Sequence, residues 1–210
     1  MFAVAARFPT AYIFNRVLEM RLIVILLSIA LAGCNDSGGS SPSNNFAMLG
    51  DSIIAMMGQY QPSLPAPFNT ATNLGIGGQT STQIAARIGS AVGSPMLLLE
   101  GGINNLNDPD QIVADYTAML NAIPPTTTIF FLGIIQLDEG PLPVNYAALN
   151  LSNAKVNAVD ARLNDLCASH PNCHVQTAAQ TGSMVGLTQD GIHPNQAGYS
   201  AIVSRILTGS

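Results

Sequence analysis

Hydrophobic and polar residues alternate in a regular order from Phe46 to the C-terminus. Short apolar runs of four or five residues are separated by longer segments in which apolar residues recur at helical spacing. This alternation of strands and helices is typical of an α/β domain with a parallel sheet. The runs predict five strands, at Phe46–Leu49, Ala71–Leu74, Met96–Leu99, Thr128–Leu132 and His174–Thr177.

The longer segments predict helices with recognisable ends. One helix begins at Asp108, an N-cap residue, has Pro109 in its first turn and stops before Pro124. A second extends from about Val144 to Leu166, and a third begins near Pro194. Their apolar stripes are interpreted as core faces without chemistry; they include Tyr116, Leu120, Val159, Leu163, Tyr199 and Ile202.

The segment from Met20 to Asn45 has the organisation of an export signal followed by a tether. Arg21 precedes an apolar run from Leu22 to Ala32, which is shorter than the roughly 20 residues that span a bilayer. The sequence LAGC, which ends at Cys34, resembles the lipobox of bacterial lipoproteins, in which the cysteine is lipidated and becomes the mature N-terminus. An ordinary cleaved signal peptide or a weak membrane anchor is the alternative.

These features divide the chain into three parts. Residues 1–33 are interpreted as a signal segment with its start at Met20, residues 34–45 as a flexible tether, and residues 46–210 as one folded domain. The predicted location is the periplasmic face of a bacterial cell envelope. Asn35 stands where an aspartate is linked to inner-membrane retention, which favours the outer membrane.

Composition and charge limit the classes of function. Hydrophobic residues make up 48% of the sequence and charged residues 9%, which is typical of a packed domain and excludes a disordered chain. Four basic and eleven acidic residues follow Cys34, a net charge of 4 − 11 = −7. Such a surface repels phosphate backbones, so we expect no nucleic-acid partner.

Cys167 and Cys173 lie close together in the segment CASHPNCH. In an oxidising periplasm, a disulfide that closes this short loop is predicted. The alternative is a zinc site that also uses His170 and His174, but the spacing C-x2-H-x2-C-H matches no familiar zinc finger. We therefore predict no metal site and interpret both histidines as surface or loop residues.

Four loops after the predicted strands carry residues from which an active site could be built. GDSII follows the first strand and contains Ser52, NLGIGGQTS follows the second and contains Gly78, and EGGINNLND follows the third and contains Asn104. TQDGIHPNQAGY follows the fifth and contains Asp190 and His193. Because the carboxyl ends of parallel strands share one edge of a sheet, we expect these loops to meet there.

Other motifs are disfavoured by single residues. GDSII lacks the second glycine of the G-x-S-x-G nucleophile elbow, and GIGGQT has Thr80 where the dinucleotide-binding motif has glycine. No G-x-x-x-x-G-K-[ST] motif occurs, so nucleotide binding is unsupported. The segment Thr80–Gln83 is predicted to cap a helix.

Taken in order, the four loops resemble the sequence blocks of the SGNH hydrolases, a branch of the GDSL esterases and lipases. The matching residues are Gly50–Asp51–Ser52, Gly78, Gly102–Ile103–Asn104, and Asp190 with His193–Pro194. Asn105 stands where the family usually has aspartate, which leaves the geometry of that loop open. The resemblance extends from Phe46 to the C-terminus and implies a flavodoxin-like, three-layer α/β/α sandwich around the five-stranded parallel sheet.

The resemblance implies a Ser52–His193–Asp190 triad, and the chemistry of these residues independently permits it. Ser52 would attack an ester carbonyl, His193 would take its proton, and Asp190 would orient the imidazole. The backbone N–H groups of Ser52 and Gly78 and the side-chain amide of Asn104 would form the oxyanion hole. Glycine at position 78 lets a backbone donor approach the substrate without a Cβ atom in the way. No metal or organic cofactor is required.

Two classes of function fit this site. The favoured one is a lipid-anchored periplasmic serine esterase for small or medium acyl esters, with thioesters and lysophospholipids as further candidates. The alternative is a carbohydrate acetyl-esterase or an inactive carbohydrate-binding lipoprotein, although an inactive relative is expected to lose Ser52 or His193. The expected partners are a small-molecule ester and the membrane that holds the lipid anchor, and no protein partner is inferred.

Overall fold

Five parallel strands form the sheet at the centre of the domain, in the order β2-β1-β3-β4-β5. The structure is a computed structural model that describes residues 45–140 and 150–209. All five predicted strands are confirmed, and the last ends earlier than predicted because a helix begins at Thr177. The strands are β1 (Phe46–Gly50), β2 (Thr72–Gly75), β3 (Met96–Glu100), β4 (Thr128–Gly133) and β5 (Cys173–Val175).

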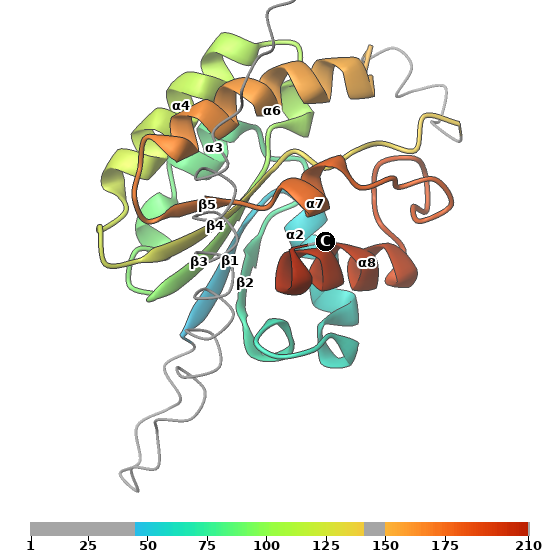
Figure 1. Ribbon diagram of the computed structural model, residues 1–210, viewed down its shortest axis with the longest axis horizontal. Helices are drawn as coiled ribbons and strands as arrows, with labels where there is room; N and C mark the ends of the chain where they lie inside the picture. The colour runs from blue at the N-terminus through green and yellow to red at the C-terminus, as the bar shows by residue number, and fades with distance from the viewer. Residues whose placement is uncertain (1–44, 141–149, 210) are drawn as a thin grey trace, which may run out of the picture. The chain divides into compact units, whose positions relative to one another are not determined.

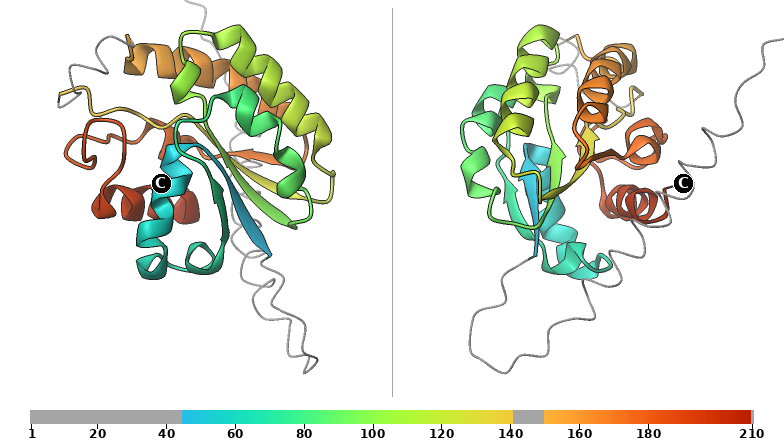
Figure 2. Two further views of the ribbon diagram at one scale, coloured as in Figure 1. Left: turned by 180° about the vertical axis from the view of Figure 1, so that it is seen from behind. Right: turned by 60° about the vertical axis from the view of Figure 1, so that its left-hand side comes forward.

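Helices cover both faces of the sheet (Figure 1; Figure 2). One face carries α2 (Ser52–Tyr60), α7 (Thr177–Thr181) and α8 (Gln196–Thr208), and the other carries α3 (Ser81–Ala85), α4 (Pro109–Ala122) and α6 (Asn153–Ala168). Right-handed crossovers explain why α2 lies on one face and α3, α4 and α6 on the other, because the chain moves from β1 to β2 in one direction and then from β2 through β3 and β4 to β5 in the other. The predicted three-layer α/β/α sandwich is confirmed. Short 3₁₀ helices occupy Gln61–Ser63, Phe68–Thr70, Ile88–Ser90 and Ile103–Asn105.

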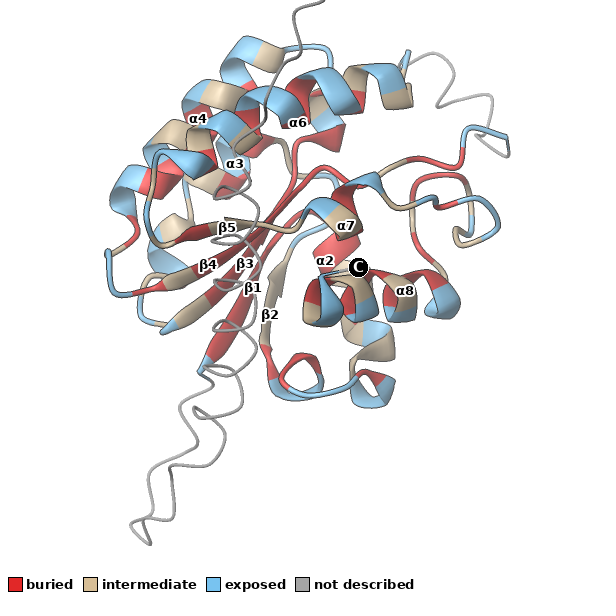
Figure 3. Cartoon of the chain, in the orientation of Figure 1, coloured by how far each residue is buried: buried red, intermediate tan, exposed pale blue. Residues whose placement is uncertain are grey.

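The inner strands are apolar along most of their length because helices cover both of their faces. Every residue of β1 is buried, whereas β2, at the edge of the sheet, is half-buried throughout. Figure 3 shows the buried residues gathered in the sheet and on the inner sides of the helices. Among them are Asp51 and Glu100, two carboxyl residues with no exposed surface at the carboxyl ends of β1 and β3.

Two helices begin close to their predicted positions. α4 follows the N-cap Asp108, whose side chain accepts a hydrogen bond from the first turn, and the helix ends at Ala122. α8 begins at Gln196, two residues after Pro194, because the side chain of Asn195 caps its first turn. Capping residues that are visible in the sequence therefore set these helix ends.

The predicted beginning of α6 near Val144 is wrong. The helix begins at Asn153, after Ser152 has capped it through its side chain. Asn150 has a φ of 51°, a left-handed conformation that interrupts any helix approaching from the N-terminal side. The rest of the predicted extension falls on residues 141–149, outside the described residues.

A disulfide joins Cys167, near the end of α6, to Cys173, at the start of β5. Both sulfur atoms are therefore unavailable to zinc. Within residues 45–140 and 150–209, no group of three or more His, Cys, Asp or Glu side chains could hold a metal ion. His170 lies on the turn before β5, but His174 lies within the strand and not in a loop.

The predicted signal segment, Cys34 and nearly all of the tether precede Asn45, where the described part of the chain begins. Within that described part, no helix is both long and apolar enough to cross a membrane. The division of the N-terminal region therefore stays a prediction from the sequence.

Candidate active site

Ser52 lies at the carboxyl edge of the sheet, where β1 is followed by α2. Asp51 is the N-cap of α2, and its Oδ1 accepts a hydrogen bond from the Ile53 N–H at 3.0 Å. Ser52 is the first residue of the helix, so its N–H has no acceptor within the helix. The positive end of the helix dipole adds to this donor, which makes the turn favourable for negative charge.

Asp190 and His193 lie on the turn that precedes α8. Asp190 Oδ1 accepts hydrogen bonds from the N–H groups of Ile192 and His193, at 3.1 and 2.8 Å. Asp190 Oδ2 lies 2.8 Å from His193 Nδ1, and His193 Nε2 lies 2.9 Å from Ser52 Oγ. The structure thus joins Ser52, His193 and Asp190 in one chain of hydrogen bonds, although Ser52 and His193 are 141 residues apart.

The hydrogen bonds around Asp190 keep its carboxylate ionised. Burial opposes ionisation, but donation from the His193 and Ile192 N–H groups and from the imidazole outweighs it and lowers the pKa of Asp190. An ionised carboxylate accepts the proton on Nδ1, so a neutral imidazole leaves its Nε2 lone pair facing Ser52. This tautomer is the one that can take a proton from the serine.

Gly78 lies in the loop between β2 and α3, which passes beside Ser52. A Cβ atom placed on the neighbouring Gly77 would lie 3.9 Å from the Ser52 Cβ. Gly78 itself has a φ of 76°, a left-handed conformation that residues with side chains rarely adopt, while a Cβ there would meet no atom within 4 Å. The structure therefore shows that glycine is required at position 78 by the backbone conformation and not by a lack of space for a Cβ atom.

Asn104 lies in the short 3₁₀ helix after β3. Its Nδ2 donates to the Gln79 carbonyl oxygen at 2.9 Å and lies 3.4 Å from Asp51 Oδ2. Gln79 follows Gly78, and Asp51 precedes Ser52, so the amide lies between the segments that carry the other two predicted oxyanion donors. All three segments adjoin one another.

Asn105, the residue that departs from the family pattern, joins the loop of Asn104 to α3. Its Oδ1 accepts a hydrogen bond from the Ser81 N–H at 3.0 Å, and its Nδ2 donates to Ser81 Oγ at 2.8 Å. The Ser81 hydroxyl donates to Asp115 Oδ2 at 2.6 Å. An aspartate at position 105 could not donate to Ser81 Oγ, so asparagine fits a network in which Asp115 supplies the carboxylate.

Glu100 and Asp51 form a buried carboxyl pair beside Ser52 that sequence reasoning did not single out. Glu100 Oε2 accepts a hydrogen bond from the Asp51 N–H at 3.2 Å. Burial, and then the nearby Asp51 charge, raises the pKa of Glu100 well above its ordinary value, and burial raises the pKa of Asp51. The signal in the sequence is a glutamate that ends the apolar run MLLLE, since a buried carboxyl group needs a specific role or partner.

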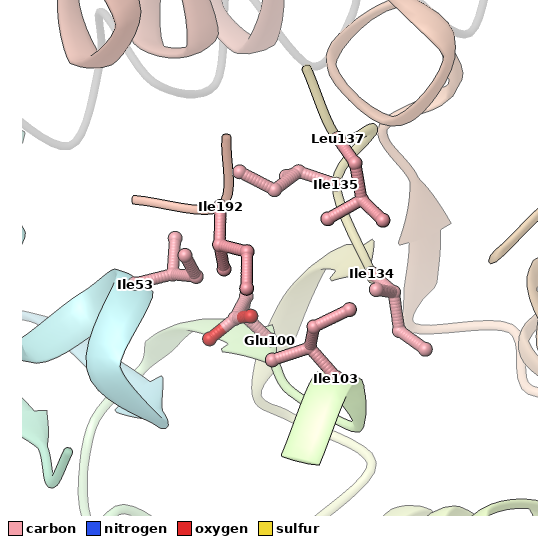
Figure 4. A pocket seen from close by; sticks show the side chains of 7 residues that line it. All are labelled: Ile53, Glu100, Ile103, Ile134, Ile135, Leu137 and Ile192. Carbon is pink, nitrogen blue, oxygen red and sulfur yellow. The ribbon is translucent and has the colours of Figure 1, made fainter. Parts of the chain in front are cut away.

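Apolar side chains pack around Glu100 (Figure 4). Three of these apolar side chains belong to direct chain neighbours of the predicted site residues. They are Ile53 beside Ser52, Ile103 beside Asn104 and Ile192 beside His193. The side chains leave no space for a water molecule, and Glu100 Oε1 has no hydrogen-bond partner among the described residues. These surroundings favour the neutral form of Glu100. The complete lining is Ile53, Glu100, Ile103, Ile134, Ile135, Leu137 and Ile192.

Asp160 on α6 is another buried carboxyl group, and its surroundings predict a pH dependence of stability. Its Oδ1 accepts a hydrogen bond from the Ile134 N–H at 3.0 Å, and burial raises its pKa from 3.8 to about 7. The folded protein keeps this proton over a pH range in which the unfolded chain has released it. The fold is therefore stabilised by Asp160 protonation at acidic pH and loses that stability as the pH rises towards 7.

Asp160→Asn retains an oxygen acceptor for Ile134 and removes the ionisation. We expect the variant to lose less unfolding free energy than the wild type between about pH 5 and pH 8, by on the order of 2–3 kcal/mol. Urea denaturation at the two pH values measures the difference. Asp110→Asn, at a largely exposed carboxylate, is the control that should behave like the wild type. Equal losses in the wild type and in Asp160→Asn would contradict the assignment.

The family comparison covers most of the described domain. The model of the GDSL-like lipase/acylhydrolase family matches residues 48–201, a range that includes Ser52, Gly78, Asn104, Asp190 and His193. No curated protein matches the chain significantly.

Solved structures show the same fold at low sequence identity. A GDSL-like lipase from Bacteroides thetaiotaomicron is 16% identical, with a TM-score of 0.63 over 87% of this chain and 94% of that chain. A psychrotrophic esterase, EstA from Pseudoalteromonas sp., is 16% identical, with a TM-score of 0.53 over 77% of this chain and 93% of that chain. A carbohydrate esterase of family 3 from Talaromyces cellulolyticus is 20% identical, with a TM-score of 0.52 over 77% and 93% of the two chains.

Proposed function

Because the chain belongs to the GDSL-like lipase/acylhydrolase family and is therefore a serine ester hydrolase, we propose that Ser52, His193 and Asp190 form its catalytic triad. The observation that carries this proposal is the position of the His193 ring. Its two nitrogen atoms lie 2.9 Å from Ser52 Oγ and 2.8 Å from Asp190 Oδ2. A nucleophile, a base and an orienting carboxylate are thus connected in the arrangement that acyl transfer requires.

Acylation begins when His193 Nε2 takes the Ser52 hydroxyl proton and Oγ attacks the ester carbonyl carbon. The electron pair of the C=O π bond moves to the carbonyl oxygen and gives a tetrahedral intermediate. The intermediate collapses to an acyl-serine as His193 returns the proton to the departing alcohol oxygen. A water molecule then loses a proton to His193 and attacks the acyl carbon, which gives a second tetrahedral intermediate. The bond from this carbon to Ser52 Oγ breaks as His193 returns the proton to Oγ, so the carboxylic acid leaves and Ser52 is restored.

The negative charge on the carbonyl oxygen is met by three hydrogen-bond donors. We assign these to the N–H groups of Ser52 and Gly78 and to the Asn104 amide. One Asn104 N–H is used by the Gln79 carbonyl oxygen at 2.9 Å, and the remaining contact, with Asp51, is long at 3.4 Å. The Asn104 N–H that faces Asp51 is therefore the one available to the oxyanion, because its present hydrogen bond is the weaker of the two.

Small or medium acyl esters are the proposed substrates. The apolar side chains around Glu100 leave no space for a water molecule, so we expect the acyl chain to lie outside them. Ile76, on the loop beside Ser52, is 47% exposed and offers an apolar contact for an acyl chain that lies along the surface. Thioesters and lysophospholipids are further candidates, since Ser52 would attack a carbonyl carbon in each.

The contact between Ser52 and His193 disfavours the alternative of an inactive carbohydrate-binding relative. Both reacting side chains are present and lie within hydrogen-bond distance of each other. A carbohydrate acetyl-esterase remains within the proposed chemistry and differs only in its alcohol. Acetylated sugars therefore belong in the same substrate test.

A panel of p-nitrophenyl esters with acyl chains from acetyl to dodecanoyl tests the proposed function. We expect hydrolysis that depends on Ser52 and is fastest with small or medium acyl chains. Acetylated sugars, acyl thioesters and lysophospholipids then distinguish the alcohol or thiol part. If no ester in the panel is cleaved faster by the wild type than by Ser52→Ala, the proposal is wrong.

We also propose a lipid anchor at Cys34, on the basis of the LAGC sequence and the polar tether that follows it. Cys34→Ala should move most of the protein from the membrane fraction to the soluble fraction and abolish incorporation of labelled palmitate. Esterase activity should stay unchanged, because Cys34 precedes the domain that carries Ser52. Immunoblots of fractionated cells measure the change.

Ser37→Ala, in the tether, is the control for this prediction and should remain in the membrane fraction. A wild-type protein that is soluble and takes up no palmitate would show that the lipoprotein assignment is wrong.

A further inference from the structure

The guanidinium group of Arg87 lies among backbone and amide oxygens near the site. Its Nη2 donates to the Gly50 carbonyl oxygen at 2.6 Å, its Nη1 donates to the Leu74 carbonyl oxygen, and its Nε donates to Gln79 Oε1 at 2.6 Å. Within residues 45–140 and 150–209, no carboxylate forms an ion pair with Arg87. This half-buried cation is therefore held by neutral acceptors alone.

The three acceptors belong to segments that carry the reacting groups. Gly50 ends β1 two residues before Ser52, and Leu74 lies near the end of β2. Gln79 follows Gly78, and its carbonyl oxygen accepts the hydrogen bond from the Asn104 amide at 2.9 Å. One guanidinium group thus connects the nucleophile turn with the loop that supports two of the oxyanion donors.

We propose that Arg87 is a positioning residue that fixes the oxyanion donors relative to Ser52, an inference that rests on the proposed function. Oxyanion stabilisation depends on donors that are in place before charge develops, so small displacements of the Gly78 loop lower the rate. The positive charge of Arg87 also offsets the partial negative charge of the Gly50 and Leu74 carbonyl groups, which lie near the carboxyl ends of β1 and β2.

The geometry requires arginine specifically. A guanidinium group presents five N–H donors in a fixed plane and can reach three separate oxygens at once. A lysine keeps the charge but donates from one nitrogen atom, and a glutamine keeps some donors without the charge. Arg87→Lys and Arg87→Gln therefore separate the contribution of the donor geometry from that of the charge.

Both variants should lower kcat for the best p-nitrophenyl ester by about 10- to 100-fold, with KM changed less than about threefold, because the donors act mainly in the transition state. The loss should be smaller for Arg87→Lys than for Arg87→Gln. Arg162→Lys and Arg162→Gln are the matched controls, since Arg162 forms an exposed ion pair with Asp110 and should leave kcat unchanged. Circular dichroism measures the folded fraction of each variant.

A double-mutant cycle separates positioning from a general loss of structure. If Arg87 acts through the oxyanion donors, adding Arg87→Lys to Asn104→Ala should lower kcat by a clearly smaller factor than Arg87→Lys does alone, because one of the donors that Arg87 positions is already missing. In addition, low millimolar guanidinium ion should partly restore kcat in Arg87→Ala, while urea at the same concentration should not. Neither compound should activate the wild type.

The proposal is overturned if Arg87→Lys and Arg87→Gln keep kcat within twofold of the wild type. It is also overturned if their losses match a lower folded fraction, or if the Arg87 and Asn104 effects multiply in the cycle. Failure of the proposed function has a different signature, because Ser52→Ala would then remain as active as the wild type. An inactive Ser52→Ala together with unaffected Arg87 variants contradicts the role of Arg87 alone.

Discussion

Replacing Ser52 or His193 by alanine is expected to lower kcat by about 10⁴- to 10⁶-fold. Ser52 supplies the attacking oxygen, and His193 Nε2, at 2.9 Å, is the acceptor for its proton, so neither side chain is effective without the other. The double variant should therefore be scarcely less active than either single variant. This non-additivity distinguishes a catalytic unit from two independent contributions to the rate.

Steady-state hydrolysis of the best p-nitrophenyl ester measures these losses, and circular dichroism checks that the variants are folded. Ser200→Ala and His170→Ala are matched controls, because Ser200 is exposed on α8 and His170 is half-buried on the turn before β5, at the edge of the sheet opposite Ser52. A Ser52→Ala protein that retains more than about a tenth of the wild-type kcat would contradict the triad, since residual activity from the oxyanion hole is far smaller.

The second largest effect is expected for Asn104→Ala, which should lower kcat by about 10²- to 10³-fold. The variant removes one oxyanion donor, and because that hydrogen bond is strongest in the transition state, KM should change much less than kcat. Ser52 and His193 remain in place, so the acyl-enzyme should still form, but slowly. Steady-state kinetics with the same ester measure the separation of kcat from KM.

Asn104→Asp provides a sharper form of this test. It has nearly the same shape as asparagine but replaces the donor by a carboxylate close to Asp51 and the Gln79 carbonyl oxygen, so it should be at least as impaired as Asn104→Ala. Asn121→Ala is the control: Asn121 is exposed in the last turn of α4, so this variant should leave kcat unchanged. A loss of less than about threefold in Asn104→Ala would remove this side chain from the oxyanion hole.

Much of the fold follows from the sequence because burial leaves a local pattern. β1, β3 and β4 are short apolar runs, and a strand that is covered on both faces can be recognised from such a run alone. Asp108 marks the start of α4 through a side chain that hydrogen-bonds within a few residues, whereas α8 begins two residues after the predicted Pro194, where Asn195 caps it. The start of α6 could not be predicted, because the left-handed conformation of Asn150 is not encoded in any apolar periodicity.

The positions of the candidate site residues follow from the sequence for a different reason. Ser52, Gly78, Asn104 and His193 each come after a strand of a parallel sheet, so topology alone brings them to one edge. The short Asp190 turn brings its carboxylate to His193 within three residues. The order of the loops was therefore sufficient to anticipate the contacts of His193 with Ser52 and Asp190.

Interactions that support the site from other parts of the chain were not predictable. Arg87 reaches Gly50 across 37 residues, and Glu100 reaches Asp51 across 49, and neither distance leaves a periodic signal. The role of Asn105 also depends on Asp115, which lies on a different element. Such contacts depend on how the loops pack together, which local propensity does not determine.

Labelling with a serine-directed fluorophosphonate tests the central claim most directly, because the probe reacts with a serine that an adjacent base has activated. Intact mass and peptide mapping should show one adduct on the wild type, at Ser52. The adduct should be absent in Ser52→Ala and should form much more slowly in His193→Ala. A folded wild-type protein that stays unlabelled, or a Ser52→Ala protein that is labelled as fast as the wild type, would contradict the account.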